Sequence, residues 1–206
     1  MTKVLVINSS ILGDASASRA LVAKAVAGLR ARHPGLQVVE RDVGAAPLPH
    51  LTGETVGALR RDAADASPAE KATRALSDQL IAEVMDADFI VIGSPMYNLG
   101  IHSGLKTWFD HVLRAGATFQ YTANGPQGLV PAKPVLVVES RGGFYSEGPA
   151  AAYNAQEPHL RAVLGLMGLT QPTFVRAESL AMGPDAVTPA MDAAAKAVEA
   201  WIAALA

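Results

Sequence analysis

The stretch VIGSPMYNLGIHSGLKTWFDHV, residues 91–112, begins with the pattern of a buried strand and ends with that of an amphipathic helix. The helical part places apolar side chains on one face at helix spacing: Leu105, Trp108, Phe109, Val112 and Leu113. We therefore expect Trp108 and Phe109 to lie in the core. The loop between the two parts carries Tyr97 and Asn98, after a strand that has no acid, base or thiol.

Strand patterns recur along the chain. Continuous apolar runs rich in β-branched residues occupy residues 4–7, 89–92, 135–138 and, more weakly, 173–180. Such runs predict strands that are covered on both faces. Residues 36–43 alternate more, which predicts an edge strand.

Helical patterns separate the strands, at residues 18–32, 67–87, 150–167 and from 188 to the end of the sequence. The second begins with Ser67 as N-cap, Pro68 at the first helical position and Glu70 closing a capping box. Parallel strands need right-handed crossovers, so helices should cover both sheet faces. We expect an α/β fold, a flavodoxin-like doubly wound five-stranded parallel sheet with helices on both faces.

Two insertions interrupt this alternation. Residues 48–66 follow the edge strand, and residues 116–133 predict a hairpin with Asn124 and Gly125 in its turn. The sequence shows no internal repeat and no linker. We therefore expect residues 1–206 to form a single domain.

The composition excludes several classes of protein. The net charge of −2 predicts no attraction to nucleic acid or to an anionic membrane. The absence of cysteine excludes disulfides, thiolate catalysis and the usual zinc sites. The five histidines fall at no metal-ligand spacing, so we expect no bound metal. The sequence shows no signal peptide or membrane-spanning run, which predicts a cytoplasmic protein.

Three loops should meet at the carboxyl ends of the strands, where ligands bind in this architecture. The first, residues 8–20, presents Ser9, Ser10, Ser16 and Ser18 beside the N-terminus of a predicted helix, which favours an anion. The loop has neither G-x-G-x-x-G nor G-x-x-x-x-G-K-[ST], so one terminal monophosphate suits it best. The alternative is a polar capping loop with scattered serines.

The second loop exposes Met96, Tyr97, Asn98 and Leu99 after the strand at 89–92. A flat aromatic ligand would explain these residues, because the side chains can cover a ring and the amide can bond its heteroatoms. The alternative is an ordinary strand-to-helix connection with an asparagine turn and a buried methionine.

The third loop, residues 139–149, contains Gly142 and Gly143 directly after a buried strand. Paired glycines let a ligand approach the backbone, and their N–H groups could donate to a carbonyl edge. The alternative is a tight turn beside a solvated Arg141. A monophosphate at the first loop and a flat ring between the other two together describe FMN.

Four motifs occur in order along nearly the whole chain: VLVINSSILG with S-x-S, SPMYN before an LK-x-W-F-D helix, TFQYTANGPQGL, and SRGG. In these the chain resembles the FMN-dependent NADH:quinone oxidoreductases, also known as azoreductases. The resemblance implies a homodimer with one FMN per subunit at the interface. It implies electrons from NADH or NADPH, and a quinone or azo compound as acceptor.

The resemblance also implies the residues of the site. It places FMN contacts at Ser10, Ser16, Ala17, Ser18, Met96, Tyr97, Asn98, Leu99, Ser140, Arg141, Gly142 and Gly143. It places substrate contacts at Arg60, Phe119 and Tyr121, partly from the other subunit. Two positions depart from many relatives: Leu99 and Gly100 replace an aromatic after the asparagine, and Ala17 stands where relatives carry glutamine.

No catalytic side chain is expected, because hydride enters and leaves at flavin N5 in a ping-pong cycle and the protein positions the reactants. Asn98, Gly142 and Gly143 would position or tune the ring. One alternative is a flavodoxin-type electron carrier without NADH turnover, and another is a flavin-free signalling module on the same fold. A serine hydrolase is disfavoured because G-x-S-x-G does not occur.

Overall fold

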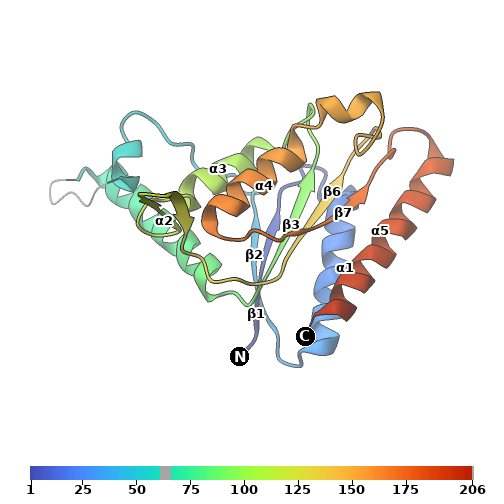
Figure 1. The fold of residues 1–206 in the computed structure, drawn as a ribbon, viewed down its shortest axis with the longest axis horizontal. Helices are drawn as coiled ribbons and strands as arrows, with labels where there is room; N and C mark the ends of the chain where they lie inside the picture. Colours follow the sequence, from blue (N-terminus) through green and yellow to red (C-terminus); the bar gives the residue numbers. More distant parts are fainter. Residues whose placement is uncertain (61–65, 206) are drawn as a thin grey trace.

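The computed structural model describes residues 1–60 and 66–205 and is built on a five-stranded parallel sheet (Figure 1). The strand order is β2-β1-β3-β6-β7, which confirms the flavodoxin-like prediction and places β2 at an edge. The strands are β1 (Lys3–Asn8), β2 (Gln37–Asp42), β3 (Phe89–Pro95), β6 (Val135–Ser140) and β7 (Thr173–Ala177).

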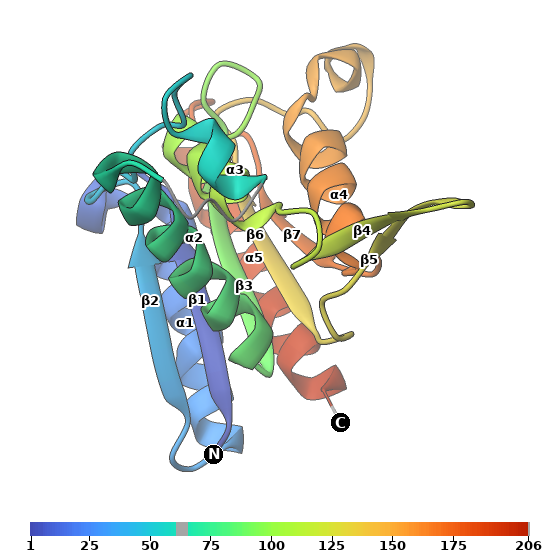
Figure 2. The ribbon, with the colours of Figure 1, turned by 90° about the vertical axis from the view of Figure 1, so that its left-hand side faces the viewer.

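Helices cover both faces of the sheet, as predicted, with α2, α3 and α4 on one face and α1 and α5 on the other (Figures 1 and 2). The helices are α1 (Ala17–Arg32), α2 (Pro68–Asp86), α3 (Ser103–Val112), α4 (Gln156–Met167) and α5 (Pro184–Ala204). Three short 3₁₀ helices lie in the connections: η1 (Gly13–Ala15), η2 (Val56–Leu59) and η3 (Pro149–Tyr153).

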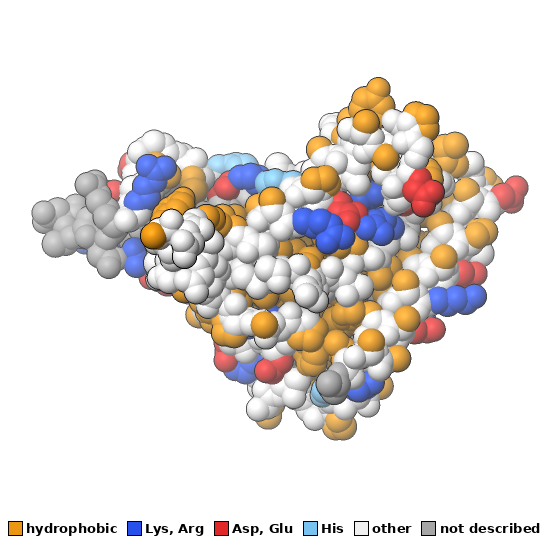
Figure 3. Space-filling view, in the orientation of Figure 1, with side chains coloured by type: hydrophobic (Ala, Val, Ile, Leu, Met, Phe, Trp, Pro, Cys, Tyr) orange, Lys and Arg blue, Asp and Glu red, His pale blue; other side chains and the backbone are white. Residues whose placement is uncertain are grey.

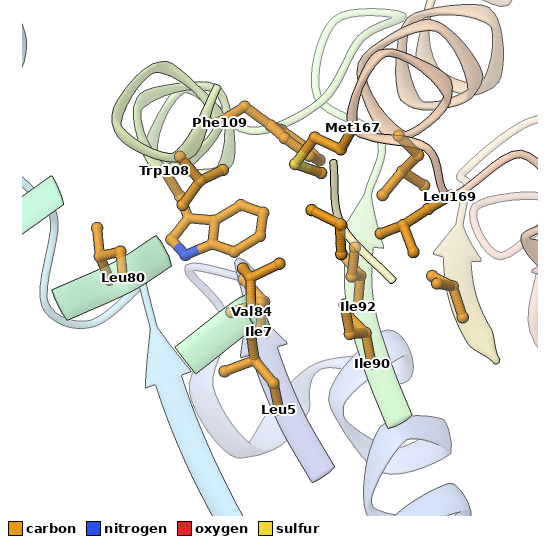
Figure 4. Close-up of a cluster of buried hydrophobic side chains, with 14 of the residues drawn as sticks. Leu5, Ile7, Leu80, Val84, Ile90, Ile92, Trp108, Phe109, Met167 and Leu169 are labelled. Atoms are coloured by element: carbon orange, nitrogen blue, oxygen red, sulfur yellow. The ribbon is translucent and has the colours of Figure 1, made fainter. Parts of the chain in front are cut away.

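Each central strand supplies both cores, because successive side chains point to opposite faces. In β1, Leu5 and Ile7 belong to the core under α2, α3 and α4, whereas Val4 and Val6 belong to the core under α1 and α5. This explains the continuous apolar runs. Figure 4 shows Trp108 and Phe109 of α3 facing the strands, which confirms their predicted place in the core.

The helix beginnings follow local capping chemistry. The capping box of α2 is present: the Ser67 hydroxyl accepts the N–H of Glu70, and the Glu70 carboxylate accepts the N–H of Ser67. The predicted single helix over 150–167 is wrong. The chain breaks at Asn154, whose side-chain oxygen accepts the N–H groups of Gln156 and Glu157, so that α4 begins anew after η3.

Two further boundaries differ from prediction. The last helix begins at Pro184 and not at Thr188, because Pro184 takes the first helical turn and Pro189 is accommodated inside the helix. The last strand ends at Ala177 and not at Leu180. Glu178 turns into a buried ion-pair cluster, and Ser179 adopts a left-handed φ of 62°.

The insertion at 116–133 forms the predicted hairpin, which extends away from the main sheet (Figure 2). It consists of β4 (Phe119–Thr122) and β5 (Gly125–Gly128). Thr122 pairs with Gly125, so the turn is formed by Ala123 and Asn124 and not by Asn124 and Gly125. Position 125 still requires glycine, because the residue that begins β5 has a φ of 103°, which other residues rarely adopt.

The ammonium group of Lys133 caps the carboxyl end of α2. It donates to the carbonyls of Val84 at 2.7 Å and Met85 at 3.0 Å, and also to that of Ala87. A cation at this end of a helix satisfies free carbonyls and the helix dipole. The contact ties the segment before β6 to the end of α2.

We expect Lys133→Met to lower the free energy of unfolding by about 1–2 kcal/mol, because three carbonyls lose their charged donor. Urea unfolding measures this. Lys196→Met, at an exposed position of α5, is the matched control and should change the free energy by less than about 0.5 kcal/mol. Equal values for the two variants would contradict a capping role for Lys133.

Within residues 1–60 and 66–205, none of the helices combines the length and the apolar character needed to cross a bilayer.

Candidate functional site

The segments that follow β1, β3, β6 and β7 surround a cavity at the carboxyl edge of the sheet, with a volume of about 380 Å³. This size lies within the range of small-molecule sites. The residues that line it are Ser10, Leu12, Ala15, Ser16, Ala17, Pro95, Met96, Tyr97, Ser140, Arg141, Gly142, Leu180, Ala181 and Val187. The structure thus brings the three predicted loops together at one site.

The first loop ends in the N-cap of α1. The Ser16 hydroxyl accepts the N–H of Arg19 at 3.2 Å and lies 3.1 Å from the Ser18 hydroxyl. The N–H groups of Ser10, Ala17 and Ser18 donate to no residue in the described part of the chain. These groups and the positive end of the helix dipole form a cradle for an anion.

The second loop is a tight turn over residues 97–100. Tyr97 and Gly100 exchange backbone hydrogen bonds of 3.0 and 3.1 Å, and Asn98 and Leu99 between them have φ values of 46° and 73°. Two left-handed central residues are typical of a type I′ turn. The left-handed conformation is common for asparagine and costs energy for leucine. The Tyr97 hydroxyl accepts the N–H of Ile11 at 3.1 Å and so joins this turn to the first loop.

His102 begins α3 beside this turn. Its Nδ1 accepts the N–H of Gly104 at 3.1 Å. Its ring packs edge to face with the Tyr97 ring, and the two ring centroids are 5.4 Å apart. Burial lowers the pKa of His102. The neutral ring is therefore favoured, which is the form that can accept this hydrogen bond.

The third loop leaves two backbone donors free. The carbonyls of Arg141, Gly142 and Gly143 accept N–H groups of residues 179–181 at 2.9–3.1 Å. The N–H groups of Gly142 and Gly143 have no acceptor among the residues described. Gly142 lines the cavity, so an acceptor atom in the cavity would meet a donor there.

Arg141 is not a solvated charge. Its side chain is fully buried, and it donates to Glu139 at 2.7 Å, to Gln156 at 2.9 Å and to Glu178 at 3.0 Å. The guanidinium group is therefore occupied by protein partners. The backbone of Arg141 is bonded as well, because its N–H donates to the Ala177 carbonyl at 2.9 Å and its carbonyl accepts the Leu180 N–H at 3.1 Å.

The other predicted site residues lie outside the cavity wall as described. Ser18 is buried behind Ser16, and Asn98 and Leu99 form the tip of their turn. Gly143 follows the wall residue Gly142.

The predicted substrate residues are also apart from the lining. Arg60 is exposed after η2. Phe119 is 7% exposed, and its ring packs edge to face with the ring of Tyr121. Tyr121 is 77% exposed on the hairpin. Among the described residues, no cluster of three or more potential metal ligands occurs.

Comparison with known proteins gives concordant results. The sequence matches a protein family described as "flavodoxin-like fold" over residues 2–202. An FMN-dependent NADH:quinone oxidoreductase of Hyphomonas neptunium is 47% identical over 194 residues, which cover 94% of this chain and 92% of that protein. A protein of the same name from Escherichia coli O139:H28 is 45% identical over 204 residues, 99% of this chain and 100% of the other.

The chain belongs to the family of FMN-dependent NADH:quinone oxidoreductases.

Solved structures agree with this family assignment. The azoreductase of Bacillus anthracis str. Sterne has a TM-score of 0.88 and 29% identity, and covers 98% of this chain and 100% of the other. The FMN-dependent NADH-azoreductase of Bacillus anthracis str. Ames Ancestor, in complex with FMN, has a TM-score of 0.86 at 21% identity and covers 98% of each chain. The second likeness shows the fold alone.

Sequence reasoning missed part of this family member's cavity wall. Leu180, Ala181 and Val187 come from the segment after β7 and from α5. A signal for the first two existed, because the segment after every parallel strand reaches the same edge of the sheet. Sequence gave no signal for Val187, since the predicted helix began one residue after it.

Proposed function

We propose that this protein is an FMN-dependent NADH:quinone oxidoreductase that also cleaves azo compounds reductively. The observation that carries the proposal is the match at 45–49% identity, over more than nine-tenths of each chain, to proteins of that name. The cavity supports it independently, because free backbone donors of Ser10, Ala17 and Gly142 line it.

The residues present fit FMN. We assign the phosphate to the Ser10 and Ser16 hydroxyls and to the free N–H groups of Ala17 and Ser18, which need an anionic acceptor. Met96 and Tyr97 also line the cavity, and we assign the ribityl chain and the ring to them.

The ring edge is assigned to the third loop, residues 140–143. When bound, FMN supplies two-electron hydride chemistry between NADH and the acceptor. The free N–H groups of Gly142 and Gly143 would donate to the carbonyl edge of the ring, where negative charge increases on reduction. Asn98 would position the ring from the opposite loop. The chain needs no catalytic acid or base for this step, since stacking and alignment suffice.

Acceptor binding is assigned to the exposed face of the ring. We propose that NADH or NADPH and the quinone or azo compound use this face in turn, with Arg60, Phe119 and Tyr121 beside it. Such alternation predicts ping-pong kinetics. Intersecting double-reciprocal lines for NADH and benzoquinone would contradict it.

We further propose that the chain is a single domain over residues 1–206 and acts as a cytoplasmic homodimer. The cavity rim supports association, because exposed apolar side chains lie on or next in sequence to its wall and the loop that continues it: Ile11, Leu12, Phe144 and Met182. Figure 3 shows hydrophobic side chains on the projecting segment that carries η3. Apolar groups gathered at a rim in this way are typical of association surfaces.

The test is an anaerobic visible spectrum of the purified protein with FMN, before and after NADH. We expect a bound flavin band that bleaches with NADH and returns with benzoquinone. A bound flavin that responds to neither NADH nor NADPH would indicate the electron carrier instead. A protein that binds no flavin would refute the proposal.

Tyr97 provides a smaller test of the cavity. Tyr97→Phe removes the acceptor of the Ile11 N–H and so uncouples two loops that we assign to FMN. We expect the dissociation constant of FMN to rise by about three- to tenfold, the equivalent of one hydrogen bond. Fluorescence titration with FMN measures it. Tyr153→Phe is the control, because Tyr153 is exposed and its hydroxyl has no partner among the described residues. A value for Tyr97→Phe equal to the control would show that the two loops are not coupled.

A further inference from the structure

A buried cluster of charged and polar side chains lies beneath the third loop, and the proposed function does not use it. We call it the Arg141 cluster; it consists of Glu139, Arg141, Gln156, Glu157, Arg176 and Glu178. It joins β6, α4 and the end of β7. Its outer part reaches the surface over α4, where Figure 3 shows basic and acidic side chains side by side.

Arg141 is the centre of the cluster. Nη2 donates to Glu139 at 2.7 Å, Nε to Gln156 at 2.9 Å and Nη1 to Glu178 at 3.0 Å. The Gln156 amide in turn donates to the Ser94 carbonyl at 2.6 Å, at the end of β3. The guanidinium group thereby ties Arg141, the residue before Gly142, to β6, to α4 and to the end of β7, and through Gln156 to the end of β3.

Glu178 holds the other side of the same loop. Its carboxylate accepts the N–H of Tyr145 at 2.8 Å and a hydrogen bond from the Ser146 hydroxyl. Burial opposes its ionisation, but these bonds and Arg141 outweigh burial and lower the pKa of Glu178. The residues before and after Gly142 and Gly143 are therefore anchored to one carboxylate.

Between these anchors, the backbone carbonyls of Gly142 and Gly143 have protein partners, and their two backbone N–H groups have none among the described residues. Residues 179–181 occupy the carbonyls of 141–143, so the N–H groups of Gly142 and Gly143 are left for a ligand. The orientation of these two donors is set by those backbone bonds and by the Arg141 and Glu178 anchors on either side, because glycine itself imposes no preferred backbone conformation.

Glu139 gives the cluster an adjustable charge. Its side chain is fully buried, and its Oε1 has no partner among the described residues. Burial raises the pKa of Glu139 to about 7; Glu157 raises it further, while Arg141 and Arg176 oppose the rise. The carboxyl lies next in sequence to the wall residue Ser140.

We propose that Arg141 and Glu139 are positioning residues for the bound ring. Arg141 aims the N–H groups of Gly142 and Gly143 at the cavity, and the charge on Glu139 sets the electric field at those groups. The proposal rests on the proposed function for its consequence: an ionised Glu139 opposes the negative charge that the ring gains on reduction. The charged groups around Glu139 are Arg141, Arg176 on β7, Glu157 on α4 and, through Arg141, Glu178.

The first experiment needs no cofactor. The amide chemical shifts of Gly142 and Gly143 are followed by NMR from pH 5.5 to 8.5 in the FMN-free full-length protein and in Glu139→Gln. We expect both signals to titrate near pH 7 in the parent and to stay flat in the variant. The variant separates an effect of Glu139 from any effect of the histidines, because the histidines are the same in both proteins. Flat parent signals, or unchanged titration in Glu139→Gln, overturn the proposal.

The second experiment uses the FMN-loaded protein. We expect Glu139→Gln to raise the flavin midpoint potential at pH 8 and to match the parent at pH 6. We expect Arg141→Met to weaken FMN binding at least tenfold, with partial rescue in Arg141→Lys. Arg161→Gln removes an arginine that pairs with Glu157 on the surface, and should leave affinity and potential unchanged.

The outcomes separate the two proposals. A purely structural cluster would lower the melting temperature of Glu139→Gln without altering the pH dependence of the potential, and that result overturns the positioning role. A parent that binds FMN but whose potential is independent of residue 139 refutes this inference alone. A parent that binds no FMN refutes the proposed function, while the NMR titration still decides whether Glu139 acts on the two glycines.

Discussion

Replacing Gly44 by alanine should abolish most FMN binding, with a rise in the dissociation constant of at least about tenfold. A Cβ atom at this position would lie 2.3 Å from the backbone oxygen of Ser10. Backbone cannot yield as a flexible side chain would, so the segment at Ser9 and Ser10 must move. That segment forms one side of the cradle assigned to the phosphate.

The same substitution should lower the free energy of unfolding by about 1–3 kcal/mol, as overpacking at a tight contact does. Fluorescence titration with FMN and urea unfolding measure the two effects. Gly53→Ala is the matched control, because a Cβ atom there meets no atom within 4 Å. If Gly44→Ala binds FMN within twofold of the parent, then the position of Ser10 does not determine phosphate binding.

The second large effect concerns Glu139 and pH. Because the pKa of the buried carboxyl is raised from 4.5 to about 7, the folded state binds this proton more tightly than the unfolded state does. The stabilising contribution is therefore full below pH 4.5 and is lost as the pH rises through 7. By linkage, the loss between pH 5 and pH 8 amounts to about 2–3 kcal/mol.

Urea unfolding of the parent and of Glu139→Gln at several pH values isolates this contribution. We expect the glutamine variant to gain about 2–3 kcal/mol relative to the parent between pH 5 and pH 8. Burial lowers the pKa of His102 and of His159, but both histidines are common to the two proteins, so their contributions cancel in the difference. Glu54→Gln, at an exposed site, should show no such trend. A difference that stays constant with pH would mean that Glu139 is ionised throughout.

Much of the fold followed from local pattern. The apolar runs in β1, β3 and β6 show their burial on both faces, and the capping box at Ser67 marks the beginning of α2. The break before α4 and the end of β7 did not follow from local pattern, because hydrogen bonds of particular side chains cause them. The Asn154 side chain accepts the N–H groups of Gln156 and Glu157 and so begins α4 separately from η3. The end of β7 depends on Glu178 reaching Arg141 across 37 positions of sequence.

The candidate site divides in the same way. Ser10, Tyr97 and Gly142 each come two residues after the end of a parallel strand, so the topology of the sheet alone brings them to one edge. The role of Arg141 could not be predicted, because an arginine after a strand has the same sequence pattern whether it is solvated or buried. Its three partners come from separate elements, and only their packing reveals that the guanidinium group faces inward.

The turn over residues 97–100 has a consequence for how fast and how tightly a ligand can bind. The turn is held by its own two backbone bonds, by the Ile11 N–H on Tyr97 and by the Ala155 N–H on the Leu99 carbonyl. Its conformational entropy is therefore lost when the chain folds and not when a ligand arrives. A preorganised wall of this kind favours affinity and leaves association limited by access to the cavity and not by a rearrangement. The strained backbone of Leu99 is the energetic cost of that rigidity. The protein maintains this strain in the folded state, so the wall needs no induced fit.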